Sequence, residues 1–112
     1  MTEIMVEAYQ DGKKDVLTEF LDGLTDKNDV KKIRKLVHIL QTQGRELGLP
    51  ISRGLGEGLH ELRDQSRGFR IYYAFFGKSL AILLVIGDKS SQESDIERAR
   101  NRRKKLLEQR GE

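Results

Sequence analysis

The pattern of hydrophobic residues predicts an α+β fold with the element order β-α-α-β-β-β-α and an antiparallel sheet. Apolar side chains recur at helical spacing between residues 16 and 40, and three strand-like segments follow one another between residues 59 and 86. We expect the two helices to pack on one face of the sheet and a third helix to follow it. A chain of 112 residues suits one such core, so residues 1–112 are expected to form a single domain.

The first half of the chain is predicted to contain one strand and two helices. Residues 3–9 are rich in β-forming side chains that alternate in polarity, which predicts the strand. Residues 16–24 repeat apolar side chains at helical intervals, and residues 30–40 do so more clearly, with their basic residues mostly off the apolar stripe. Asp26 or Asn28 is suited to cap the second helix.

The second half is predicted to form a strand meander that ends in a helix. Residues 44–58 hold five glycines and the only proline, so we expect a loop there. Residues 59–63, 69–76 and 80–86 are separated by short polar turns and are expected to pair as antiparallel strands. The continuous apolar run of the last strand predicts that it is covered on both faces. Residues 96–109 carry a thin apolar stripe, which predicts the final helix.

The composition excludes several classes of function. The chain has no cysteine, and its two histidines cannot form a zinc site by themselves, so we expect neither a metal nor another cofactor. No apolar run reaches the roughly 18 residues that a membrane span requires, so no membrane partner is expected. Glu3 and Glu7 stand where a signal peptide would be basic and then apolar, which predicts a cytoplasmic protein.

The net charge of +3 is distributed unevenly. Residues 1–50 contain 8 basic and 9 acidic side chains, whereas residues 51–112 contain 13 basic and 9 acidic ones. A polyanionic partner is therefore expected to bind the second half, although the excess could also be ordinary solubilising charge. Six of the eight residues 98–105 are basic. This run is either a solvated helix face or an RNA contact, for which the candidates are Arg100, Arg102 and Arg103.

Alternation along the strands brings three further cations together. Arg70 and Tyr72 share one strand face, which we expect to be the open face of the sheet. Arg63 lies across a short turn from Arg70, and Lys89 follows the last strand. Guanidinium groups bind phosphate oxygens in a fork geometry, and a tyrosine ring can stack on an unpaired base. The three cations and Tyr72 therefore predict a phosphodiester-binding site.

The carboxylates near these cations leave an alternative open. Glu61 shares a strand face with Arg63, and Asp64 follows directly. Arg63 and Arg70 could simply form ion pairs with these two residues across the strands. Glu61 is also a candidate for RNA binding or for a general base, although an ion pair with Arg63 fits the pattern better.

Three segments resemble the RelE/HigB superfamily of type II toxin–antitoxin toxins, in particular its phage-derived addiction-module-killer branch. They are residues 56–63 (GEGLHELR), 68–73 (GFRIYY) and 87–99 (GDKSSQESDIERA), in that order. The resemblance implies a RelE-like fold and an endoribonuclease that cleaves messenger RNA at the ribosome. It also implies neutralisation by a cognate helix-turn-helix antitoxin.

The resemblance implies catalytic roles for Arg63, Arg70 and Lys89, which match basic positions of the superfamily. One departure is that no aromatic or histidine residue follows Phe76, where some relatives place a tyrosine or histidine late in the chain. This departure favours one alternative, a non-catalytic member of the fold that binds RNA or protein. A second alternative from the same superfamily is a ParE-like toxin that poisons DNA gyrase, although the joint presence of Arg63, Arg70 and Lys89 speaks against it.

Overall fold

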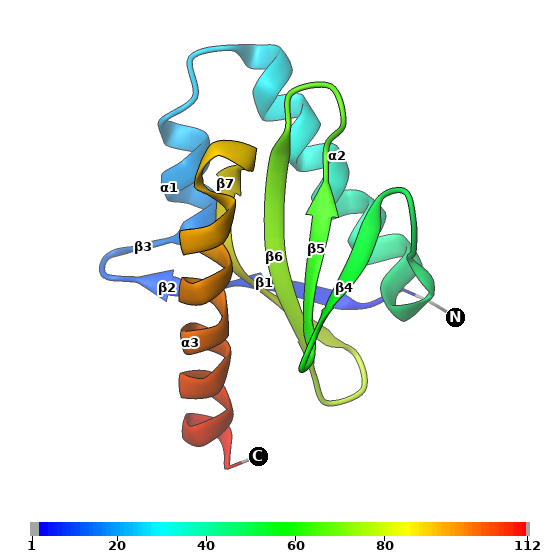
Figure 1. Ribbon diagram of the computed structural model, residues 1–112, viewed down its shortest axis with the longest axis vertical. Coiled ribbons are helices and arrows are strands. Elements are labelled where there is room, and N and C mark those ends of the chain that lie inside the picture. The colour runs from blue at the N-terminus through cyan, green and yellow to red at the C-terminus, as the bar shows by residue number, and fades with distance from the viewer. Residues whose placement is uncertain (1–2, 112) are drawn as a thin grey trace.

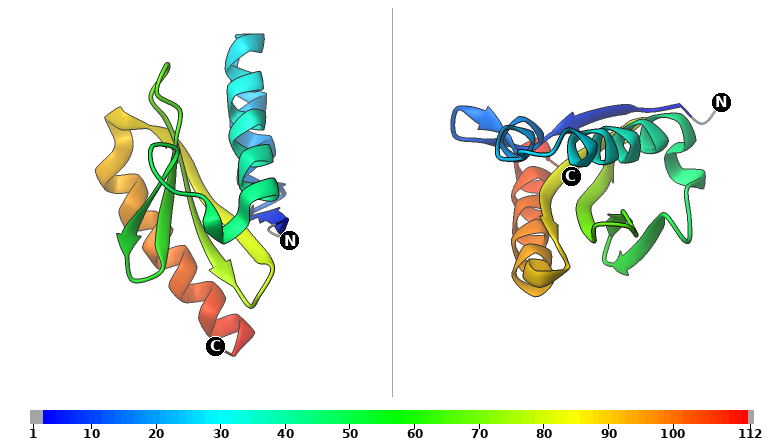
Figure 2. Two further views of the ribbon diagram at one scale, coloured as in Figure 1. Left: turned by 90° about the vertical axis from the view of Figure 1, so that its right-hand side faces the viewer. Right: turned by 90° about the horizontal axis from the view of Figure 1, so that it is seen from above.

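The main sheet has helices on both of its faces (Figure 1). Residues 3–111 are described in the computed structural model. In the left view of Figure 2 the sheet lies between α2 and α3. The elements are β1 (Met5–Ala8), β2 (Gln10–Asp11), β3 (Lys14–Asp15), α1 (Val16–Asp22), α2 (Lys27–Gln43), the 3-10 turn η1 (Gly44–Glu46), β4 (Ser52–Gly56), β5 (Leu59–Arg63), β6 (Phe69–Phe76), β7 (Leu80–Asp88), the 3-10 turn η2 (Lys89–Ser91) and α3 (Gln92–Arg110).

The predicted α+β class is confirmed, and the sheet differs from the prediction in one pairing. Its strand order is β1-β7-β6-β5-β4, and β4 to β7 form the expected antiparallel meander. β1 runs parallel to β7, with Met5 opposite Leu80, so the sheet is mixed rather than antiparallel. This pairing places β1 beside the apolar β7, and the half-buried Val6 and Ala8 pack with the helices α1 and α2.

Part of the segment expected to be a loop is the edge strand β4. Ser52–Gly56 pairs with β5, although three glycines lie within residues 54–58. These glycines permit a tight turn, because Gly56 and Gly58 adopt positive φ angles of 90° and 80° that other residues rarely adopt. The glycine content was therefore a sign of the turn rather than of a long loop.

The core consists of two clusters, one on each face of the sheet. The first lies under α1 and α2 and includes Val16, Ile33, Leu36, Leu40, Leu62, Ile71, Tyr73 and Leu83. The second lies under α3 and includes Leu59, Tyr72, Ala74, Phe76, Leu84, Val85 and Ala99. The face that was expected to be open is therefore covered by α3 along much of its length. The prediction was wrong because the apolar stripe of α3, although thin, is sufficient to bury that face.

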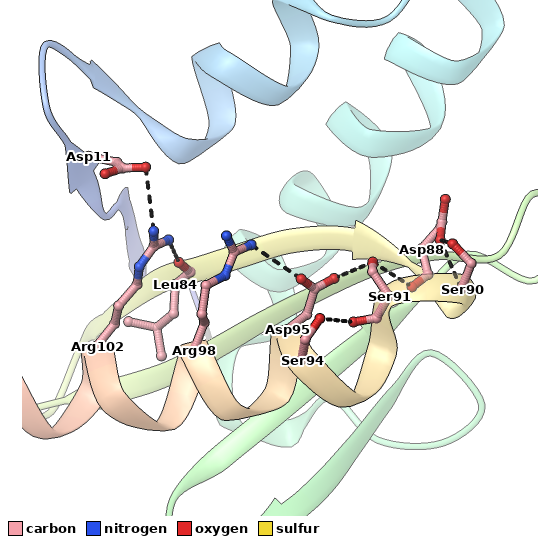
Figure 3. Close-up of polar contacts among 9 residues, drawn as sticks. All are labelled: Asp11, Leu84, Asp88, Ser90, Ser91, Ser94, Asp95, Arg98 and Arg102. Carbon is pink, nitrogen blue, oxygen red and sulfur yellow. Dashed lines mark hydrogen bonds and ion pairs between the residues drawn. The ribbon is translucent and has the colours of Figure 1, made fainter.

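The start of α3 is fixed to the end of β7 by short side chains (Figure 3). The carboxylate of Asp88 accepts a hydrogen bond from the backbone N–H of Ser90 at 2.8 Å, and Ser91 Oγ donates to Asp95 at 2.6 Å. Asp95 lies so close to Gly87 that a Cβ at that position would collide with its carboxylate. These contacts set the direction in which the chain leaves the sheet at Lys89. None of the helices described within residues 3–111 is long and apolar enough to cross a membrane.

Candidate nucleic-acid interface

A cationic hollow of about 440 Å³ lies where β5 ends, β6 begins and β7 ends. Arg63 is the last residue of β5 and pairs in register with Arg70 on β6. Arg70 is in turn opposite Gly87, and Lys89 follows Gly87 two residues later in the chain. The full lining is Arg63, Asp64, Gln65, Ser66, Arg67, Gly68, Arg70 and Lys89. The structure thus places all three predicted catalytic residues around one hollow, while their catalytic role stays a prediction.

A buried carboxylate holds Arg70 in the wall of this hollow. Glu61 is 0% exposed, and its Oε1 lies 3.2 Å from Nε of Arg70. The second oxygen of Glu61 accepts a hydrogen bond from Arg53 at 3.0 Å, and Gln92 donates to Oε1 at 3.2 Å. Two guanidinium groups and an amide therefore surround one carboxylate, which offsets the cost of burying it.

This arrangement corrects the roles expected for Glu61. It is neither an RNA contact nor an accessible general base, because its side chain has no exposed surface and both oxygens have partners. It pairs with Arg70 rather than with Arg63, so the ion-pair alternative is correct for Arg70. Within residues 3–111 no carboxylate forms an ion pair with Arg63, which lines the hollow and whose buried Nε has no hydrogen-bond partner there.

Tyr72 cannot act as the predicted stacking platform. Its side chain lies in the cluster under α3 and is 0% exposed. Burial, with the carboxylates of Glu61 and Asp95 nearby, raises the pKa of Tyr72 to about 12. No other residue among 3–111 forms a hydrogen bond with its hydroxyl. Tyr72 is thus a neutral core residue. Its predicted strand face is correct, but the expected exposure was wrong because α3 covers this part of the face.

A fourth cation in the hollow, Arg67, was missed by the sequence reasoning. Arg67 lies in the β5–β6 turn with its side chain about half exposed, and its Nη2 is 3.2 Å from the buried carboxylate of Asp29 on α2. Asp29 occupies the same helix face as Ile33, Leu36 and Leu40, which are the other buried residues of α2. A carboxylate at such a position requires a cationic partner, and this was the signal that could have identified the pair.

The hollow carries a net positive charge. Four of its lining residues are cationic and one, Asp64, is acidic. The Asp64 carboxylate accepts hydrogen bonds from the backbone N–H of Arg67 at 2.8 Å and from Ser66 Oγ at 3.1 Å. Asp64 therefore shapes the turn. Arg67 and Arg70 are already paired with Asp29 and Glu61, so the excess positive charge of the hollow comes from Arg63 and Lys89, which form no ion pair with a carboxylate among residues 3–111. Such a site favours an anion with several oxygen acceptors, such as a phosphodiester.

The three α3 arginines that were RNA-binding candidates do not line this hollow. Arg100 donates to the backbone oxygens of Leu55 at 2.8 Å and Gly56 at 3.1 Å. Arg102 donates to the Leu84 oxygen at 2.7 Å (Figure 3), and Arg103 lies against Gly58. Their positive charges attach α3 to the sheet and to the β4–β5 turn. RNA binding by these three residues stays a prediction that their placement does not favour.

Comparison with known proteins assigns the chain to a family. Residues 19–104, more than half of its length, match the family described as "Phage derived protein Gp49-like (DUF891)". The chain belongs to the Gp49-like family. This is a phage-derived family associated with toxin–antitoxin systems. The matched range of this Gp49-like protein contains the whole cationic hollow and the Asp29–Arg67 pair.

A curated relative of this Gp49-like protein is found in Haemophilus influenzae and is described as an uncharacterized protein. The two are 41% identical over 49 residues, which is 43% of this chain and 50% of the relative. The chain thus aligns with half the length of that relative.

Proposed function

We propose that this Gp49-like protein is the toxin of a type II toxin–antitoxin module and that it cleaves messenger RNA at the ribosome. The observation that carries the proposal is the convergence of Arg63, Arg67, Arg70 and Lys89 around one hollow. The family's association with toxin–antitoxin systems supports the biological setting. A cognate helix-turn-helix antitoxin would neutralise the protein by covering or filling the hollow with acidic groups, because the site attracts anions.

The proposed reaction uses the RNA's own nucleophile. The 2′-hydroxyl attacks the adjacent phosphorus and loses its proton to solvent, while the bond from phosphorus to the 5′-oxygen breaks. The products are a 2′,3′-cyclic phosphate and a 5′-hydroxyl. Arg70 offsets the charge that develops on the phosphoryl oxygens, and Arg63 holds the neighbouring phosphate. Lys89, exposed at the rim, adds positive charge and supplies a proton to the departing 5′-oxygen.

One feature of the hollow favours a second candidate, a non-catalytic RNA-binding protein. Its described lining contains neither a histidine nor a tyrosine, the residues that often exchange protons with RNA. Such a protein would hold RNA through the same cations without breaking it.

The test compares matched lysine variants in cells that lack the antitoxin. Lys89→Ala removes a cation of the hollow, and Lys78→Ala removes another exposed lysine, from the β6–β7 turn at the other end of the sheet. We expect the parent and Lys78→Ala to arrest growth and to produce discrete new 5′ ends within translated messages. We expect Lys89→Ala to lose both effects.

Other outcomes of this experiment distinguish the alternatives. Growth arrest without new 5′ ends supports RNA binding without cleavage. Arrest with stalled replication supports the gyrase-poisoning alternative. A Lys89→Ala variant that cleaves messages as fast as Lys78→Ala would remove Lys89 from the mechanism.

A further inference from the structure

A second hollow adjoins the cationic one on the other side of the β5–β6 turn. Its volume is about 360 Å³, and it lies between α2 and the segment that leads into β4. It shares Arg63, Asp64, Gln65 and Ser66 with the cationic hollow. Its remaining lining residues are Lys32, Lys35, Leu36, Ile39, Pro50 and Ile51. We name it the lysine-rimmed hollow.

The lining combines apolar and cationic groups in a way that suits a nucleotide. Leu36, Ile39 and Ile51 provide an apolar surface against which a flat base can pack. Gln65 provides an amide with both donors and an acceptor, which can bind the polar edge of a base. A wholly apolar partner would not require the cations at the rim.

The charge at the rim selects an anionic occupant. Lys32, Lys35 and Arg63 stand against the single carboxylate Asp64, so the lining has a net charge of +2. Lys35 is exposed, so its ammonium is available to a phosphate of the occupant. The cationic hollow is continuous with this rim through Arg63 and the turn. A single RNA strand that crosses the turn would thus meet phosphate-binding groups on both sides.

The turn between the two hollows is held in place by an ion pair whose carboxylate is buried. Arg67 Nη2 lies 3.2 Å from Oδ2 of Asp29, which fixes the β5–β6 turn against α2. The hydrogen bonds from Ser66 and Arg67 to Asp64 stiffen the same turn. The wall of the lysine-rimmed hollow is therefore formed before a ligand binds, which reduces the entropy cost of binding.

We propose that the lysine-rimmed hollow is a base-binding subsite for a nucleotide next to the scissile linkage. The proposal rests on the proposed RNA substrate and adds that one neighbouring base is bound in this hollow. The subsite would contribute to the choice of the cleaved sequence, because Gln65 and Ser66 contact the edge of that base.

The test measures binding of a four-nucleotide RNA whose 2′-hydroxyls are all methylated, so that it cannot be cleaved. Two further probes carry an abasic site on the 5′ or on the 3′ side of the central linkage. We expect removal of one of these two bases to weaken binding to the parent protein about fivefold, the lower range of base stacking. Backbone amide NMR shifts are expected to move at Ile39 and Gln65 with the full RNA and not with the weaker abasic probe.

Two variants locate the base. In Ile39→Glu a carboxylate replaces part of the apolar surface. We expect the ratio of the affinities for the full RNA and for the weaker abasic probe to fall to near one. Lys35→Glu is expected to weaken binding of the full RNA about fivefold. Its matched control Lys31→Glu reverses another exposed charge on α2, outside the hollow, and is expected to change binding less than about twofold. Lys35→Glu does not alter the apolar core, so it tests the proposal even if Ile39→Glu is poorly folded.

The outcomes separate the subsite from the proposed function. If neither abasic probe binds more weakly while Lys89→Ala still weakens binding, RNA binds the cationic hollow and the subsite is overturned. If the parent protein binds none of the RNAs, or if Lys89→Ala does not weaken RNA binding, the proposed function itself fails. If Ile39→Glu keeps the base preference but no longer binds the purified antitoxin, the hollow belongs to the antitoxin and the proposal is wrong.

Discussion

Replacing the buried Glu61 by glutamine tests whether this carboxylate holds the cationic hollow together. The substitution keeps the shape of the side chain and removes its charge. Glu61 has no exposed surface, and the side chain of Arg70 beside it is only 9% exposed. In Glu61→Gln the Arg70 guanidinium loses its counter-ion while it stays largely out of water.

The cost can be estimated from the two ion pairs of Glu61. Removing one partner of a buried pair costs about 3–5 kcal/mol, because the remaining charge stays buried. The pair with Arg53 contributes less, since that side chain is 44% exposed. Glutamine still accepts a hydrogen bond, which favours the lower end of about 3 kcal/mol. At about 4 °C per kcal/mol for a chain of this size, the melting temperature is expected to fall by about 12 °C.

The assay is thermal unfolding of the purified variant next to a matched control. Glu57→Gln makes the same chemical change on the β4–β5 turn, where the side chain is 87% exposed and its oxygen is 3.9 Å from Arg100. We expect this control to melt within about 2 °C of the parent, because exposed pairs contribute little. If Glu61→Gln also melted within 2 °C of the parent, the carboxylate would not be needed to hold Arg70.

Three further predictions follow from the buried polar groups. Tyr72→Phe removes a buried hydroxyl that forms no hydrogen bond with residues 3–111, so we expect unchanged growth arrest and a stability equal to the parent or up to about 1 kcal/mol higher in denaturant titrations. Gly87→Ala forces Asp95 away from its partners, and calorimetry is expected to show a loss of about 1–3 kcal/mol. Gly54→Ala, whose added Cβ would meet only His60 Nδ1 at 4.0 Å, is expected not to show this loss. Burial lowers the pKa of His60, so as the pH drops below about 6.5 this histidine takes up a proton in the unfolded chain before it does so in the folded protein, and the stability falls. Unfolding midpoints measured between about pH 8 and 5 should show this decrease in stability. His60→Phe should abolish it. The first prediction is wrong if Tyr72→Phe no longer arrests growth. The second is wrong if the two glycine variants lose the same stability, and the third if His60→Phe keeps the pH dependence of the unfolding midpoint.

The elements with clear periodicity could be predicted from the sequence, and those that depend on distant pairing could not. Residues 30–40 lie within α2, and the three meander strands agree closely with β5, β6 and β7. The parallel pairing of β1 with β7 depends on how the whole chain closes, which no local pattern records. β4 was missed because its glycines favour turns, and its pairing with β5 overrides that preference.

The candidate site could be predicted in part, through strand register. Arg63 and Arg70 converge because a short turn places them opposite each other, and alternation shows this in the sequence. Alternation cannot show which face a later helix will cover, and this is why Tyr72 was wrongly expected at the surface. Arg67 was missed because its partner Asp29 is distant in the sequence, and only tertiary structure brings the two together.

The central claim is that the cations of the hollow act on one RNA linkage. The most direct test is the single-turnover rate at which purified protein cleaves a message on translating ribosomes, measured for Arg70→Ala, Lys89→Ala and the double variant. We expect each single change to lower the rate about 10²–10³-fold and the double change to lower it by less than the product of the two. Losses that multiply, or single variants as fast as the parent, would show that these side chains do not share one phosphodiester.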